Sequence, residues 1–335
     1  VDGYLDSLSR LSSRSNRLVL RGIVDGLAYL HRTAVDDAGR EAFAGLVRAF
    51  LGPHAERIGW QPTAEESVDN KLLRPQIISP LAYLGRHEGI LGEATELTAR
   101  FLDDRMSVTA EQASLFLPMS AWDGDEELWA RFRAAIVETT DPVMRVALIK
   151  ALGSFRNPAL LTKSLDLILD GTLRAQDFST LKRGIGPSTQ DAAWMWMTRN
   201  YDALIGKMGP TYRPYVPWMA HGFCGKGDAD RVSDFFAKAE RSPAGTERNL
   251  GQVTERIGRC VRMRAALREP LNRWLAARPA VETKAEDEGD GAEPPPSSPG
   301  SSADTPPVPN PAAAEATTSA PPKAVQKAAA PKKGK

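Results

Sequence analysis

The sequence predicts an all-α fold, in which helix pairs stack into a curved α-solenoid, followed by a disordered C-terminal tail. Apolar residues recur at helical spacing between residues that typically start and end helices. No convincing run alternates apolar and polar side chains, as a half-buried strand would. One helix pair also has an echo further along the chain, which indicates repeats.

The echo relates residues 77–102 to residues 145–170. Leu84-Gly85 separates two predicted helices in the first stretch, and Leu152-Gly153 separates two in the second. The distance between the stretches is close to two units of the roughly 40-residue class of helical repeats. One helix pair cannot bury its apolar face alone, so we expect a HEAT-like stack with a concave surface. An irregular all-α bundle is the alternative.

The N-terminal half contains several predicted helices with recognisable breaks. Residues 4–31 predict two helices that break near Ser12 to Ser15, and residues 36–57 predict one long helix. Pro75 and Pro80 should kink or delay a mostly apolar helix within residues 72–84. Two further amphipathic helices are expected at residues 90–102 and 128–137.

Residues 141–204 carry the clearest helix signals. Asp141-Pro142 and Asn157-Pro158 each place a capping side chain before a proline at the first helical position. Gly153 and Gly171 should end these two helices.

The second half of this stretch predicts two more helices. A short one opens at Asp177 or Ser179, and Ser188 to Asp191 has the spacing of a capping box before a longer one. The longer helix should bury one face and leave Trp196 partly outside it. The residues of that face are Trp194, Met197, Tyr201 and Leu204.

Two C-terminal segments each allow two interpretations. The proline-broken aromatic segment 212–218 is either a helical turn packed under its neighbours or a platform for a peptide. Residues 253–275 predict a long helix or helix pair. Along it lie Arg256, Arg259, Arg262, Arg264 and Arg268, which form either a solvated face or a surface for an acidic partner.

The order of these motifs resembles the C-terminal helical domain of zinc aminopeptidases of the aminopeptidase N type, which endoplasmic-reticulum aminopeptidases share. The resemblance covers about residues 1–277. It implies a helical bowl that closes over the active site of a catalytic domain, limits which peptides enter and holds the far end of the substrate. The motifs that carry it are Leu152-Gly153, Arg174-Ala-Gln176-Asp177, Ala193-Trp194, Asn200-Tyr201, Gly222-Phe223-Cys224 and Asp234-Phe235-Phe236.

The candidate peptide contacts are Arg174, Gln176 and Asp177. Arginine can bind a peptide carboxylate through two hydrogen bonds, and glutamine can bond backbone amides. The simpler interpretation, which we favour, is that Arg174 and Asp177 pair across one turn and stabilise a helix start.

No catalytic or metal-binding set is expected on this chain. Zinc aminopeptidases of this type carry H-E-x-x-H, in which two histidines bind the metal and the glutamate activates water. His87-Glu88 is followed by Leu91 where the second histidine should be. The family's G-x-M-E-N motif is absent as well. Zinc is therefore expected in a catalytic domain that this chain lacks. The remaining histidines are His31, His54 and His221.

Two cysteines, Cys224 and Cys260, are too few for a structural zinc site, which usually needs four ligands. They are either two buried thiols, the interpretation we favour, or a disulfide formed in an oxidising compartment.

Composition and charge narrow the functional classes. The 335 residues have a formal net charge of +1, which argues against a general nucleic-acid surface. No apolar run approaches the ~18 residues of a membrane-spanning helix. Because the chain begins with Val in helical sequence, we expect a piece of a longer protein, whose compartment stays open.

Two functions are compatible with these observations. The first is the C-terminal, substrate-enclosing domain of a zinc aminopeptidase, with the catalytic domain and a peptide as its partners. The second is a stand-alone helical-repeat scaffold that binds a protein or peptide on its concave face.

The chain should divide into a helical domain, residues 1–278, and a tail, residues 279–335. The tail lacks Trp, Tyr, Phe and Met and is dense in Pro, Ala, Ser, Glu and Lys. Such a sequence cannot bury enough apolar surface to offset its chain entropy, so we expect it to be disordered.

Removal of residues 280–335 should leave the melting temperature nearly unchanged, because the tail has no apolar stripe that could dock. Thermal unfolding followed by circular dichroism checks this expectation, and a clear loss of melting temperature would contradict it.

Overall fold

The computed structural model describes residues 1–14, 16–63 and 65–277. These residues form an all-α unit of helices α1 to α14 with short 3-10 helices and no strand, which confirms the predicted fold class. The predicted tail, residues 279–335, lies outside the described residues.

The first half contains α1 (Asp2–Ser12), α2 (Arg17–Thr33), α3 (Arg40–Ile58), α4 (Val68–Tyr83), α5 (Glu88–Asp103), α6 (Ala110–Trp122) and α7 (Glu126–Glu138). The second half contains α8 (Pro142–Leu152), α9 (Pro158–Leu169), η1 (Ala175–Asp177), α10 (Phe178–Leu181), η2 (Lys182–Gly184), α11 (Gln190–Arg199), α12 (Tyr201–Lys207), η3 (Arg213–Ala220), α13 (Asp228–Phe236), η4 (Ala239–Arg241) and α14 (Thr246–Ala276).

The predicted caps of α8 and α9 are present. Asp141 Oδ1 accepts hydrogen bonds from the backbone N–H groups of Val143 and Met144, and Asn157 Oδ1 accepts one from Ala159. The capping box predicted at Ser188 to Asp191 does not form, because the N-cap of α11 is Thr189, one residue later than predicted.

A capping box does occur at the start of α6, a helix that sequence analysis missed. The Thr109 hydroxyl accepts from Gln112 N–H, and the Gln112 side chain accepts from Thr109 N–H. Within α6, Phe116 to Ala121 are all buried, so this helix shows no polar face that would reveal its period.

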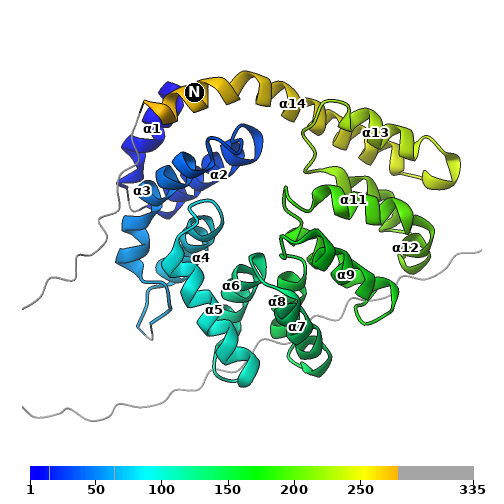
Figure 1. Cartoon of the computed structure of the whole chain (residues 1–335), viewed down its shortest axis with the longest axis horizontal. Helices are drawn as coiled ribbons and strands as arrows, with labels where there is room; N and C mark the ends of the chain where they lie inside the picture. The colour runs from blue at the N-terminus through cyan, green and yellow to red at the C-terminus, as the bar shows by residue number, and fades with distance from the viewer. Residues whose placement is uncertain (15, 64, 278–335) are drawn as a thin grey trace, which may run out of the picture. The chain divides into compact units, whose positions relative to one another are not determined.

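Successive helix pairs pack side by side (Figure 1). Helix α6 contacts α4, α5 and α8, and α9 contacts α11 and α12. The two stretches of the sequence echo fall on the pairs α4–α5 and α8–α9, and the pair α6–α7 lies between them. The echo therefore relates two helix pairs that are two units apart.

The last helix returns to the first three within this unit, as Figure 1 shows. Arg264 Nε donates to the Thr33 carbonyl at 3.1 Å, and Asn272 Nδ2 donates to Asp36 Oδ2 at 3.3 Å. Trp274 Nε1 donates to Asp6 Oδ1 at 3.3 Å. The series of helices in residues 1–277 is thus closed on itself by α14.

Asp36 is the carboxylate at this closure. A hydrogen bond from Gly39 N–H lowers the pKa of Asp36, and Asn272 and Arg268 lower it further against the opposing effect of desolvation. The carboxylate accordingly stays ionised where α14 meets the turn between α2 and α3.

Helix α11 is buried on two faces rather than one. Trp194, 4% exposed, meets Phe223 and Phe235 edge to face at centroid distances of 5.7 and 5.6 Å. Trp196, 3% exposed, donates from Nε1 to Asp166 Oδ1 at 2.7 Å and stacks on Phe178. The expectation that Trp196 lies partly outside the buried face is wrong, because α9 and α10 cover the second face.

Trp194→Ala and Trp196→Ala should each lower the free energy of unfolding by about 3–5 kcal/mol, the range for deletion of a buried aromatic side chain. Met195→Ala, on the exposed side of the same helix, should cost no more than about 0.5 kcal/mol. Urea unfolding of the three variants measures these costs. A Trp196→Ala variant as stable as Met195→Ala would contradict the second buried face.

Candidate functional site

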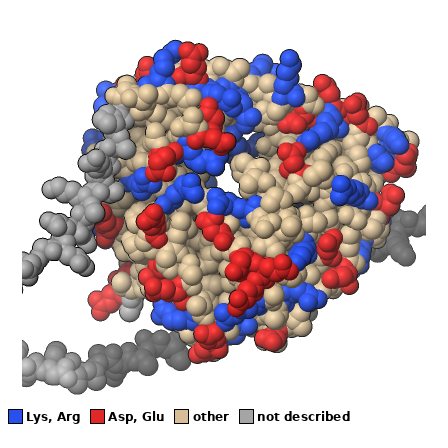
Figure 2. All heavy atoms as spheres, viewed as in Figure 1, with Lys and Arg blue, Asp and Glu red and all other residues tan. Residues whose placement is uncertain are grey.

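A cavity of about 340 Å³ lies where several interhelical turns meet the last helix. The turns follow α2, α4, α8 and η2, and α14 contributes one side chain. Its lining includes five arginines: Arg32, Arg40, Arg86, Arg156 and Arg264. In the view of Figure 2, the middle of the molecule has a hollow, and Lys and Arg side chains lie around much of the rim of this hollow.

Two of these arginines have carboxylate partners. Arg40 pairs with Asp37, and Arg156 pairs with Asp123. Arg264 instead donates to backbone carbonyls at the end of α2, where the partial negative charge of a helix C-terminus attracts a cation. Among the described residues, no carboxylate lies within ion-pair distance of Arg32, Arg86 or Arg264.

A smaller cavity, about 100 Å³, extends the cationic lining. It shares Arg32 with the first cavity and adds His221 and Arg256. Partial desolvation, and then Arg256, lowers the pKa of Arg32. Desolvation also lowers the pKa of His221, and Arg256, Lys182 and Arg32 lower it further, against the hydrogen bond to the Trp218 carbonyl. Arg32 and Arg256 are therefore close enough to repel each other, and both lie near His221.

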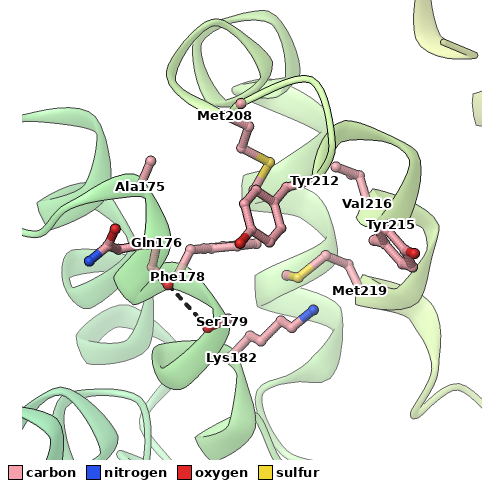
Figure 3. Close-up of a pocket in the computed structure, with 11 residues that line it drawn as sticks. Ala175, Gln176, Phe178, Ser179, Lys182, Met208, Tyr212, Tyr215, Val216 and Met219 are labelled. Carbon is pink, nitrogen blue, oxygen red and sulfur yellow. Dashed lines mark hydrogen bonds between the residues drawn. The ribbon is translucent and has the colours of Figure 1, made fainter. Parts of the chain in front are cut away.

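Lys182 connects this basic lining with a third, largely apolar cavity of about 320 Å³. Desolvation, and then the neighbouring Arg183, lowers the pKa of Lys182. Figure 3 shows the cavity between α10–η2 and the segment that leads into η3. Apolar lining residues are Phe178, Met208, Tyr212, Tyr215, Val216 and Met219.

Two tyrosines that line this apolar cavity are exposed. Tyr212 and Tyr215 are 64% and 53% exposed, whereas Val216 and Met219 beside them are buried. Most of the segment 212–218 thus lies in η3, a 3-10 helix whose Val216 and Met219 pack under its neighbours. The interpretation as a packed helical turn agrees with this structure, and the peptide platform stays a prediction.

The predicted peptide contacts Arg174, Gln176 and Asp177 are split between different environments. Gln176 lies at the edge of the apolar cavity, although its side chain points away from the two methionines in Figure 3. Arg174 is exposed. The structure does not place these three side chains together on one ligand surface.

The side-chain pair expected between Arg174 and Asp177 does not form. Asp177 Oδ2 accepts from the backbone N–H of Arg174 at 3.0 Å and from Arg145 Nη2 at 2.9 Å. Arg145 belongs to α8, so the carboxylate joins η1 to a neighbouring helix. Sequence reasoning missed this partner because it considered only residues within one turn.

Sequence reasoning also missed most of the cationic lining. Arg256 and Arg264 belong to the arginine series noted on the last helix, but no sequence pattern pointed to Arg32, Arg86 or Lys182. They come from segments far apart in the chain, and only the closure of the helix series brings them together.

Cys224 and Cys260 form a disulfide in the structure, with their Cα atoms 5.3 Å apart. The interpretation that we favoured, two free thiols, is therefore wrong, and the alternative, a disulfide, is present. The bond joins the turn before α13 to α14, next to Phe223 and Arg256 in the smaller cavity.

The described residues do not fit a zinc site. No group of three or more His, Cys, Asp or Glu side chains in this part of the chain could hold a metal ion. His87 Nδ1 accepts from Ile90 N–H at the start of α5, and His54 Nε2 bonds the Ser12 carbonyl. None of the helices that the structure describes is long and apolar enough to cross a membrane.

Comparison with curated proteins finds aminopeptidases. Aminopeptidase M1-A of Oryza sativa subsp. japonica is 27% identical over 214 residues, which are 62% of this chain and 24% of that protein. Glutamyl aminopeptidase of Homo sapiens is 24% identical over 274 residues, which are 79% of this chain and 28% of that protein. The chain spans about a quarter of the length of these relatives.

A family model for the ERAP1-like C-terminal domain matches residues 1–259. The match covers most of the helices described above and confirms the resemblance that the motif order suggested. The chain belongs to the family of ERAP1-like C-terminal domains.

Proposed function

We propose that this chain is the C-terminal, substrate-enclosing domain of a zinc metallo-aminopeptidase that removes N-terminal residues from peptides. The observation that supports this most directly is the closed series of helices with adjoining cavities, in a chain of this family. The catalytic domain is a separate part, and it and the peptide substrate are the partners of this domain.

The apolar cavity is the proposed contact for one side chain of the peptide. Its size, about 320 Å³, suits a single large apolar side chain, and burial of such a side chain contributes about 1.5–3 kcal/mol. Gln176 at its edge can bond a backbone amide, and Lys182 can bind a carboxylate. Arg174 is exposed and lies two residues before Gln176 in the chain, and it is the second proposed carboxylate contact.

Residues of this chain bind and orient the peptide in this proposal, and they break no bond. In this proposal the catalytic domain binds the zinc ion, and the described residues of this chain contribute no group of donors to it.

Purified residues 1–335 should therefore not hydrolyse alanyl p-nitroanilide with or without added zinc. Release of p-nitroaniline, followed by absorbance after removal of contaminating peptidases, measures this. Turnover that depends on zinc and co-purifies with the chain would contradict the proposed division of roles.

Ser179→Phe should weaken peptide binding by blocking the apolar cavity, which Ser179 lines from an exposed position. Loss of one buried apolar side chain should raise the Kd of a nonapeptide with a central Phe by about tenfold or more. Isothermal titration calorimetry with residues 1–335 measures the Kd.

The matched control is Ser9→Phe, which adds the same side chain at an exposed position of α1. This variant should bind the nonapeptide with the Kd of the unchanged chain. Equal Kd values for the two variants would remove the apolar cavity from the proposal. Failure of the unchanged chain to bind any peptide would contradict peptide enclosure itself.

A further inference from the structure

Six cations lie in or next to the two basic cavities and the apolar one. Five of them line a cavity, and Arg183 is the chain neighbour of Lys182. We call them the interior cation cluster: Arg32, Arg86, Arg256, Arg264, Lys182 and Arg183. Arg32 lines both basic cavities, and Lys182 lines the apolar one. The cluster brings together residues from α2, the α4–α5 turn, η2 and α14.

The members of the cluster form no ion pair within the described residues, although the pKa of Arg264, which desolvation and then Arg268 lower, is raised by Asp228. Within the described residues, none of its six members has a carboxylate within ion-pair distance. The whole chain has a net charge of only +1, so the accumulation is local and does not follow from a generally basic sequence. Like charges this close destabilise the fold unless an anion or a backbone dipole compensates them.

Structural roles explain only part of this accumulation. Arg264 donates to two carbonyls at the end of α2, and Arg256 Nε donates to the His221 carbonyl at 3.1 Å. Arg32 and Arg86 donate no hydrogen bond that the structure describes, and both are exposed to the cavity. Arg86 also has a left-handed backbone, with φ of 49°, which a long side chain rarely adopts.

We infer that the interior cation cluster binds carboxylates of the peptide, so that this domain selects acidic peptides. The inference rests on the proposed function and names its substrate class. Arginine guanidinium groups bind carboxylates through paired, charge-assisted hydrogen bonds. A peptide with an apolar residue in the apolar cavity would carry its acidic residues past Lys182 into the basic cavities.

The neighbouring apolar cavity favours a peptide over an inorganic or nucleic-acid anion. Phosphate-based anions would use the cations but leave Met208, Met219 and Tyr212 without a partner. A cavity of about 340 Å³ also holds a peptide segment but not a duplex. The ligand that uses both kinds of lining has apolar and carboxylate side chains on one chain.

Two nonapeptides that differ only at positions 3 and 5 test the inference. One has Glu at both positions and the other has Gln. Both peptides have a single Phe at the same one of the remaining positions. Calorimetric titration of residues 1–335 in 50 mM NaCl should give a Kd about tenfold or more lower for the Glu peptide. The preference should shrink in 500 mM NaCl, because salt screens exposed charges.

Arg32→Gln with Arg86→Asn removes two cations that form no ion pair or side-chain hydrogen bond within the described residues, although Arg32 lies over the Tyr29 ring. Asn tolerates the left-handed backbone at position 86, so the double variant should keep its melting temperature. In this variant the ratio of the Kd of the Gln peptide to the Kd of the Glu peptide should fall by at least about fivefold. Arg133→Gln, which removes an exposed cation of α7 outside all three cavities, should keep the preference.

The outcomes separate this inference from the proposed function. Equal Kd values for the Glu and Gln peptides would overturn the inference while peptide enclosure stands, and so would a double variant that keeps the full preference. If neither peptide bound, both proposals would fail. Tight binding of tripolyphosphate without binding of the Glu peptide would assign the cluster to an inorganic anion and overturn the inference too.

Discussion

The contact between α14 and the first three helices determines the rest of this structure. Leu271, Trp274 and Leu275 bury their side chains there, and Asp36 accepts from Asn272 and faces Arg268. An open stack of helix pairs would leave the apolar surfaces of its first and last pairs in water. Here these two surfaces cover each other, so the same contact stabilises the domain and encloses its cavities.

Closure also concentrates charge. Arg264 comes from the last helix, and Arg32 comes from the second, yet both line one cavity. Desolvation, followed by repulsion between neighbours, lowers the pKa of Arg32, His221 and Lys182. The fold tolerates this unfavourable electrostatic energy because hydrophobic burial and the closure contacts form in the same folding step and offset it. A bound anion would recover part of that energy, which gives the cavities a physical reason to attract one.

The sequence predicted those features that depend on a few neighbouring residues. Asp141 and Asn157 cap α8 and α9 as expected, because a cap needs only the next two or three backbone N–H groups. The all-α class followed from helical spacing. Helix α6 escaped detection, because burial on nearly every side removes the amphipathic pattern on which detection depends.

Features that depend on distant partners were predicted poorly. Periodicity assigns one buried face to a helix, whereas Trp196 is buried by α9 and α10 on a second face. Asp177 pairs with Arg145 of α8 instead of the nearby Arg174. For the candidate site, sequence reasoning found Gln176 and the arginines of α14 but not Arg32, Arg86 or Lys182. Their proximity is a product of the closed topology, which no local pattern encodes.

The closed series of helices has a further consequence for how this domain unfolds. In an open repeat array, each unit contacts only its neighbours, so the terminal units have half the contacts and fray first. Here α1 and α14 act as neighbours, and the described unit has no terminal pair. Separating any two neighbouring helix pairs exposes two apolar surfaces at once and loosens the pairs on both sides. We therefore expect residues 1–277 to unfold cooperatively, with no preferred end from which unfolding begins.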